Sequence, residues 1–229
     1  MTGGRARRVA ARLRRRLPGK IGPYVCTGPV SNNWGYDRGT PIDRWYIDRF
    51  LGRHRDDIHG RALEVKGAEY VTRFGHDLEH IDILDFDATN ERATFIADLE
   101  TADVIPDATF DCVVITQVVQ YCLDVKAALT HCARILKPDG VLLLTVPGIN
   151  KVEDEYELFR FTQAGCRRAA EHAFGEGNVE IDFFGNSKVT SGFLTGLAAE
   201  EFGEEQLLTA DRRFPVVITC RAVRADPSA

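Results

Sequence analysis

The sequence predicts an α/β fold, in which a doubly wound and mostly parallel sheet of seven strands carries helices on its faces. Short apolar runs alternate with stretches of helical periodicity, which is the pattern of parallel strands joined by helical crossovers. The run over 110–116 is almost continuously apolar, as expected for a strand covered on both faces. The last two runs form a hairpin-like pair, so we expect one antiparallel strand near the C-terminus.

Each element has a local signal. Thr40 is the expected N-cap of a first helix with Pro41 in its first turn, and Asp124 is the expected N-cap of a second. The expected helices cover 40–51, 124–136, 162–174 and, in part, 191–209. The expected strands cover 62–65, 81–86, 94–97, 110–116, 141–146, 179–184 and 215–223. A turn at Pro138-Asp139-Gly140 is expected to lead into the fifth strand.

The composition indicates a globular protein with one main domain. The chain has 229 residues, of which 44% are hydrophobic and 28% charged, which excludes collagen-like and disordered acidic chains. Six cysteines without a C-x-x-C pair indicate reduced and mostly buried thiols, and no apolar run suits a signal peptide or a membrane span. We therefore expect a cytoplasmic protein. No pair of ligands has a diagnostic spacing, so no metal site is expected.

Charge is distributed unevenly along the chain. The net charge is −5, yet the first 36 residues carry eight basic residues and no acidic one. The acidic remainder argues against nucleic acid as a partner. We predict a basic N-terminal arm over 1–35 and a domain over 36–229. Val9, Leu13 and Leu17 form a narrow apolar stripe on the arm, so either a solvated arm without a role or a docking helix for a partner or a membrane surface fits.

Polar residues follow several of the expected strands where a ligand should bind. In open α/β sheets, ligands lie outside the carboxyl ends of the strands, where the strand order reverses. Glu64, Asp87, Asp98 and Gln117 each end or follow an apolar run. Asp87 lies 20 residues after Gly67, a spacing that suits a carboxylate on a ribose diol, and Asp85 competes for the same role. Together these residues favour a nucleoside ligand.

Four segments in this order carry a resemblance to a known family. They read Ala-Leu-Glu-Val at 62–65, Ile-Ala-Asp-Leu at 96–99, Phe-Asp-Cys-Val-Val-Ile-Thr-Gln-Val-Val at 110–119 and Ala-Arg-Ile-Leu-Lys-Pro-Asp-Gly-Val-Leu-Leu-Leu-Thr-Val-Pro at 133–147. From about residue 40 to 224 the chain resembles the class I S-adenosylmethionine-dependent methyltransferases that act on small molecules, which have a Rossmann-like fold. Segments 36–44 and 70–75 resemble a subgroup found beside or fused to glycosyltransferases, which suggests sugar or glycoconjugate acceptors.

The resemblance implies S-adenosylmethionine as cofactor and a set of residues that bind it. That set is Glu64, Lys66, Gly67, Asp87, Asp98, Leu99, Gln117 and Val118. The turn over 64–67 would face the methionine portion of the cofactor, and Asp87 the ribose. Asp98 and Leu99 would face the adenine, whose amino group suits a carboxylate acceptor. Gln117 and Val118 would line the cofactor beside the methyl group, whose transfer depends mainly on positioning.

Two positions depart from the family pattern. The first loop of the family is rich in glycine, whereas here it has Lys66 before a single Gly67. Lysine fits this turn if its φ is negative and its side chain points out of the pocket, and its ammonium would then suit the cofactor carboxylate. The second departure is at 120–121, where Gln-Tyr stands in place of the Glu-His that the family often has.

The catalytic base is not fixed by a motif. A hydroxyl acceptor needs a base to remove its proton. The candidates are His76, His80, Asp154, Glu155 and Tyr156, and His76 and Tyr156 are the preferred two. We expect a methyltransferase that acts on an oxygen of a sugar or glycosylated metabolite. The alternatives are a non-catalytic cofactor- or partner-binding protein on the same fold, and an enzyme of this fold with different chemistry.

Overall fold

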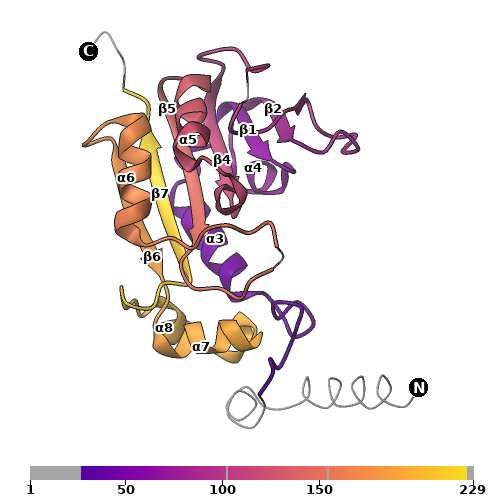
Figure 1. The fold of residues 1–229 in the computed structure, drawn as a ribbon, viewed down its shortest axis with the longest axis vertical. Coiled ribbons are helices and arrows are strands. Elements are labelled where there is room, and N and C mark those ends of the chain that lie inside the picture. Colours follow the sequence, from indigo (N-terminus) through magenta and orange to yellow (C-terminus); the bar gives the residue numbers. More distant parts are fainter. Residues whose placement is uncertain (1–26, 102, 154, 226–229) are drawn as a thin grey trace. The chain divides into compact units, whose positions relative to one another are not determined.

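The computed structural model describes residues 27–101, 103–153 and 155–225, and its sheet has the predicted class (Figure 1). The strand order is β3-β2-β1-β4-β5-β7-β6, with six parallel strands and one antiparallel strand near the C-terminus. The strands are β1 (Gly60–Val65), β2 (Leu78–Asp85), β3 (Phe95–Ile96), β4 (Phe110–Thr116), β5 (Leu136–Pro147), β6 (Val179–Phe184) and β7 (Val217–Val223). The order reverses between β1 and β4, and both flank the ligand position of such folds.

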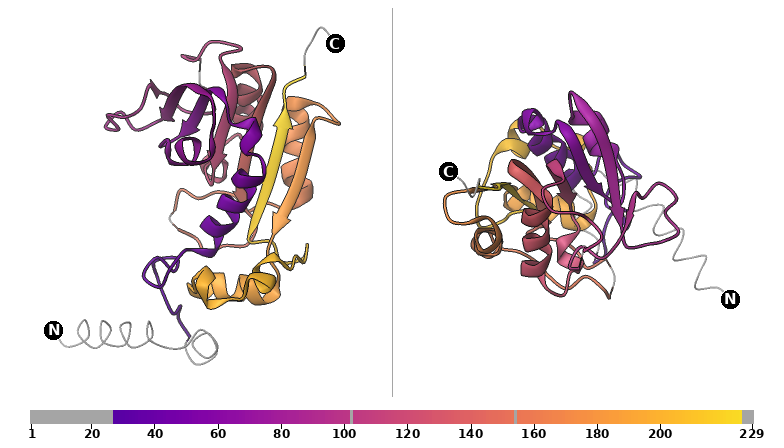
Figure 2. Two further views of the ribbon diagram at one scale, coloured as in Figure 1. Left: turned by 180° about the vertical axis from the view of Figure 1, so that it is seen from behind. Right: turned by 90° about the horizontal axis from the view of Figure 1, so that it is seen from above.

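The helices follow the strands as the periodicity predicted, with one addition. They are α3 (Ile42–Arg53), α4 (Glu69–Phe74), α5 (Val125–Ile135), α6 (Gln163–Phe174), α7 (Ser187–Thr195) and α8 (Glu204–Leu208). Asp124 caps α5 by accepting from two backbone N–H groups, and Thr162 caps α6 in the same way with one. Helices α5 and α6 lie side by side on one face of the sheet (Figures 1 and 2).

The described residues divide into two compact units. One lies within residues 47–148, 152–182 and 218–229 and holds β1 to β5 with α4, α5 and α6. Its core is formed by strands β4 and β5, whose residues 112–115 and 141–146 are all buried. Of the described residues, the other unit takes 27–46, 149–151 and 183–217, and it holds α7 and α8.

The structure corrects several expected boundaries. Thr40 is not an N-cap, because its hydroxyl and its N–H both donate to the Glu200 carboxylate and α3 begins only at Ile42. The expected turn at 138–140 lies inside β5 as an irregularity, with Asp139 at a φ of 63°. Helix α4 was not predicted, since only Val71 of its six residues is buried and its apolar periodicity is therefore weak.

Two further predictions concern buried thiols and the N-terminal arm. The five described cysteines are buried and unpaired, as expected, and Cys26 lies outside the described residues. The apolar stripe of the arm also lies outside them. Val30, however, is buried, and its N–H donates to the Thr195 carbonyl at 2.7 Å, so packed residues begin before Tyr36. No helix among the described residues is long and apolar enough to cross a membrane.

Candidate functional site

The carboxyl ends of β1, β2 and β4 meet at one edge of the sheet. β1 pairs in parallel with both neighbours, and Glu64 stands opposite Ile83 of β2 and Val114 of β4. The residues that follow these strands are therefore neighbours at this edge, which is where ligands of open α/β sheets bind. We refer to it as the carboxyl edge.

Glu64 ends the buried part of β1 and is occupied by contacts within the chain. Its side chain is 4% exposed, and its carboxylate accepts from the N–H groups of Val71 at 2.8 Å and Tyr70 at 3.3 Å. Burial raises the pKa of Glu64, although these two hydrogen bonds partly oppose the shift. The carboxylate thus holds the start of α4, and both of its oxygens are already used.

The turn after β1 corrects the expectation for Lys66. Its φ is 71°, in the left-handed region, so the condition of a negative φ is not met, and the residue is exposed. For a residue with a Cβ, this conformation is less stable by roughly 1–2 kcal/mol. Gly67 follows, and a Cβ at this position would lie 1.9 Å from the Glu69 carboxylate. The turn therefore holds a strained lysine at 66, and a side chain at 67 would displace the exposed Glu69 carboxylate.

The loop after β2 presents two carboxylates in different states. Asp85 ends the strand at 7% exposure and accepts from the N–H of Asp87 and from the Asn90 side chain at 2.8 Å. Asp87 is exposed, and hydrogen bonds from the N–H and hydroxyl of Thr89 lower its pKa. Both bonds go to Oδ1, so Oδ2 of Asp87 accepts no hydrogen bond from the described part of the chain.

Asp98 and Leu99 follow the short strand β3. Asp98 is exposed and accepts from the N–H of Glu100 at 2.9 Å through Oδ1 alone, which leaves Oδ2 open toward the described residues. Leu99 is buried.

Phe86 lies between Asp85 and Asp87 in the loop after β2, is 73% exposed, and was not predicted as a site residue. Its signal was present, because an aromatic ring directly after a buried strand sits at the carboxyl edge.

The end of β4 contains several buried polar atoms that have no hydrogen-bond partner among the described residues. Gln117 has a φ of 56°, and its Nε2 is buried without a hydrogen bond among the described residues. Gln120 is 3% exposed; its Nε2 donates to the Gln117 carbonyl at 2.9 Å, while its Oε1 has no such partner. The hydroxyl of Thr145, on β5, is likewise unpartnered within the described chain. Such groups are rare in folded proteins and require an explanation.

Val118 and the segment after β5 lie around this cluster. Val118, half-buried, precedes the short 3-10 helix over 119–121. Leu158 and Phe159 donate their N–H groups to the Gln120 carbonyl at 2.9 and 3.2 Å. Tyr156 belongs to the same segment and is 69% exposed.

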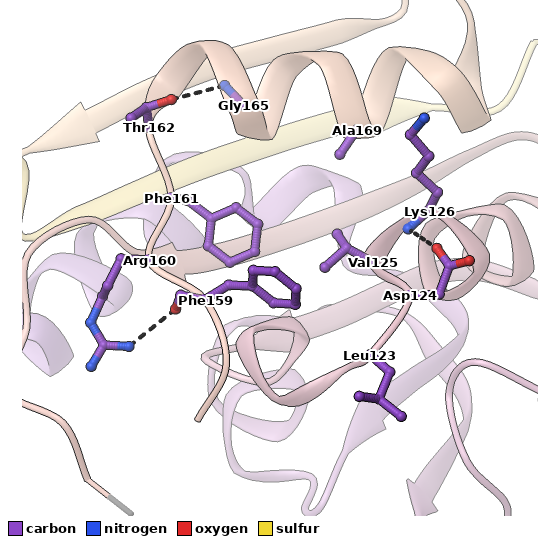
Figure 3. Close-up of a pocket in the computed structure, with 10 residues that line it drawn as sticks. All are labelled: Leu123, Asp124, Val125, Lys126, Phe159, Arg160, Phe161, Thr162, Gly165 and Ala169. Atoms are coloured by element: carbon purple, nitrogen blue, oxygen red, sulfur yellow. Dashed lines mark hydrogen bonds between the residues drawn. The ribbon is translucent and has the colours of Figure 1, made fainter. Parts of the chain in front are cut away.

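This segment also lines an open pocket that the sequence did not indicate. The pocket has a volume of about 430 Å³ and lies at the first turns of α5 and α6 (Figure 3). The rings of Phe159 and Phe161 lie beside each other there, with Val125 and Ala169 opposite (Figure 3). These aromatic positions carry no period or spacing that would have singled them out in the sequence.

His76 lies at the wrong end of the sheet for the proposed chemistry. Its N–H donates to the carbonyl of Ile58, just before β1, and β2 begins two residues after it. The length of a strand, roughly 20 Å at 3.3 Å per residue, separates it from the carboxyl edge. His80, near the start of β2, contacts Asp82 and lies toward the same amino end. Asp154 lies outside the described residues.

Comparison with known proteins agrees with this geometry. Residues 63–144 match the family model of a methyltransferase domain. A S-adenosylmethionine-dependent methyltransferase from Archaeoglobus fulgidus is similar at a TM-score of 0.53 and 17% identity, over 79% of this chain and 94% of that one. A chain of the complex between the Haloferax volcanii Trm112 methyltransferase activator and a putative methyltransferase is similar at 0.51 and 17%, over 84% and 96%.

A structure with a different activity in its description is also similar. It is the [4+2]-cyclase SpnF, at a TM-score of 0.53 and 18% identity over 90% of both chains. No curated protein sequence matches the chain at a significant level. The matched model over 63–144 is that of a methyltransferase domain, and the strand order and the fold neighbours show the Rossmann-like fold of S-adenosylmethionine-dependent methyltransferases.

Proposed function

We propose that this chain transfers a methyl group from S-adenosylmethionine to a neutral hydroxyl oxygen of a small molecule, such as a sugar or a glycosylated metabolite. The observation that carries the proposal is the carboxyl edge, where Asp87 and Asp98 each keep one carboxylate oxygen without a partner in the described chain, and where buried amide atoms of Gln117 and Gln120 likewise have none. Nucleoside hydroxyls and amino groups need such acceptors, and a hydroxyl acceptor suits such amides.

The residues at this edge fit the cofactor. Asp87 and Asp98 each keep one carboxylate oxygen open toward the described chain, which suits a ribose diol and an adenine amino group. Phe86, which precedes Asp87, is exposed and offers apolar surface, whereas Leu99, which follows Asp98, is buried. Asp85 remains the competitor for the ribose, although its own oxygens already have partners. When bound, S-adenosylmethionine supplies an electrophilic methyl group.

Two amide groups indicate the chemistry of the acceptor. Gln117 offers a donor through Nε2 and Gln120 an acceptor through Oε1, and a hydroxyl group both accepts and donates. Neither side chain is charged, so an anionic acceptor would gain no ion pair from them. A site built to hydrogen-bond a hydroxyl rejects the analogue that lacks it, by about 10⁴-fold where the groups are buried.

Tyr156 is the proposed base, and its phenolate form would accept the proton of the hydroxyl and become the neutral phenol. It lies on the segment whose backbone is hydrogen-bonded to Gln120, and its side chain is exposed and accessible. Tyr156→Phe should lower kcat while leaving cofactor affinity unchanged. If kcat is unchanged in this variant, another group removes the proton.

The direct experiment uses isotopically methyl-labelled S-adenosylmethionine and a panel of methyl glycosides, each with a deoxy and a uronic acid counterpart. Mass spectrometry should find the label on a neutral glycoside and not on the corresponding deoxy compound. Preferential labelling of amine, carboxylate or carbon acceptors in a parallel panel would contradict the proposal.

A second candidate is a protein of this fold that binds the cofactor without transferring its methyl group. Two observations favour it: the strained Lys66 beside a crowded Gly67, and the similarity to a structure described as a [4+2]-cyclase. Binding of S-adenosylhomocysteine without turnover on any acceptor panel would select this candidate. A protein partner is a further possibility of either candidate, given the similar chain from a complex with a methyltransferase activator.

A further inference from the structure

An exposed ion pair beside the turn after β1 has no part in the function proposed above. Glu69 begins α4, and Arg92 lies in the loop between β2 and β3. Nη1 of Arg92 lies 2.9 Å from Oε1 of Glu69, and the two side chains are 62% and 67% exposed. Arg92 lowers the pKa of the Glu69 carboxyl, so the pair is charged at neutral pH.

The pair is held against the turn from two sides. The Glu69 carboxylate lies so close to Gly67 that a Cβ there would be 1.9 Å from Oε2. The loop that carries Arg92 is fastened by Asn90, whose side chain donates to the Lys66 carbonyl at 3.2 Å and accepts from the Arg92 N–H at 3.1 Å. One negative and one positive group therefore stand next to each other at the strained turn.

Glu64, the other carboxylate of this turn, is not available to a ligand. Both of its oxygens accept backbone N–H groups of α4, and the side chain is buried. An ammonium group that approaches the turn would therefore meet the carboxylate of Glu69 first.

We infer that Glu69 and Arg92 bind the zwitterionic amino-acid end of the cofactor, Glu69 accepting from its ammonium and Arg92 donating to its carboxylate. This inference rests on the proposed function, in which the turn over 64–67 faces the methionine portion. Exposed ion pairs contribute little to stability, so exchanging the internal pairing for two pairings with the ligand costs little. A zwitterion supplies one opposite charge to each residue.

The experiment compares two probes by titration calorimetry. S-adenosylhomocysteine has the amino-acid end, whereas 5′-methylthioadenosine has the same adenosine and thioether without it. Glu69→Gln and Arg92→Met should each lower the affinity for S-adenosylhomocysteine by about 10- to 150-fold, which is the range for loss of a charge-assisted hydrogen bond. Both variants should bind 5′-methylthioadenosine as the wild type does. Arg213→Met, which breaks the exposed pair with Asp211, is the matched control and should change neither affinity.

Four other outcomes overturn the inference. Equal weakening of both probes would mean that the pair only supports the turn, which a lower melting temperature of the variants would accompany. Unchanged affinity would mean that the ligand does not meet the pair, and tighter binding of S-adenosylhomocysteine would mean that Glu69 blocks the turn. If the wild type binds neither probe, the proposed function itself fails. If the wild type binds S-adenosylhomocysteine alone, the inference is tested with that probe: weaker binding by both variants but not by Arg213→Met supports it, and unchanged binding by the variants overturns it.

Discussion

Lys66→Gly should stabilise the protein, because the backbone of this residue is strained. Lys66 has a φ of 71°, where a side chain costs roughly 1–2 kcal/mol relative to glycine. Glycine loses more backbone entropy on folding, by roughly 0.5–1 kcal/mol, so the net gain is about 0.75 kcal/mol at the centres of the two ranges. For a domain of this size, that gain corresponds to a rise in melting temperature of about 1–4 °C.

Lys66→Ala is the matched control, since it removes the charge and keeps the Cβ. Its free energy of unfolding, measured by urea denaturation, should stay within about 0.5 kcal/mol of the wild type, as for most exposed positions. A Lys66→Gly protein that is no more stable than Lys66→Ala would refute the argument from backbone strain. Affinity for S-adenosylhomocysteine should change little in Lys66→Gly. A parent that binds none and a glycine variant that recovers binding would identify a pseudo-methyltransferase.

Three other predictions concern burial, pH and the N-terminus. Thr145→Val removes a buried hydroxyl without a partner in the described chain and should stabilise by about 1 kcal/mol; a loss of similar size would reveal a partner. Burial raises the pKa of Glu64 in the folded protein above its value of about 4.3 in the unfolded chain. Protonation of Glu64 therefore stabilises the folded protein fully below about pH 4.3, and this stabilisation is lost as the pH rises through the pKa of the folded state. The unfolding free energy of the wild type minus that of Glu64→Gln should therefore fall over this interval in urea titrations, and a rise would contradict the shift. A chain that begins at Tyr36 should melt several degrees lower because it loses buried Val30, whereas deletion of 1–20 should leave the midpoint unchanged.

The fold followed from the sequence wherever burial alone decided the structure. The bounds of β4 and β6 agree with the apolar runs, because both strands are set by residues that face the core. Helix α5 followed from its expected cap at Asp124, and α6 from the apolar spacing over 162–174, and both are local signals. Thr40 shows the limit of such signals: its hydroxyl donates to Glu200, which is 160 residues away in the chain. No local pattern encodes that contact.

The candidate site was predictable in position but not in the state of its groups. Strand ends placed Asp87, Asp98 and Gln117 at the carboxyl edge, because parallel strands expose their ends together. Which carboxylates already have partners depends on loop geometry, as the difference between Asp85 and Asp87 shows. His76 was expected near the reacting groups but lies at the amino end of β2, because the sequence around a loop histidine does not indicate which end of a strand it flanks.

The central claim is that the carboxyl edge binds the adenosine of S-adenosylmethionine through open carboxylates. Titration calorimetry of S-adenosylhomocysteine into the wild type, Asp98→Ala and Asp87→Ala tests it most directly. We predict binding by the wild type, and affinities about 10- to 150-fold weaker in each variant, with melting temperatures unchanged. Wild-type affinity in both variants, or no binding by the wild type, would contradict the account.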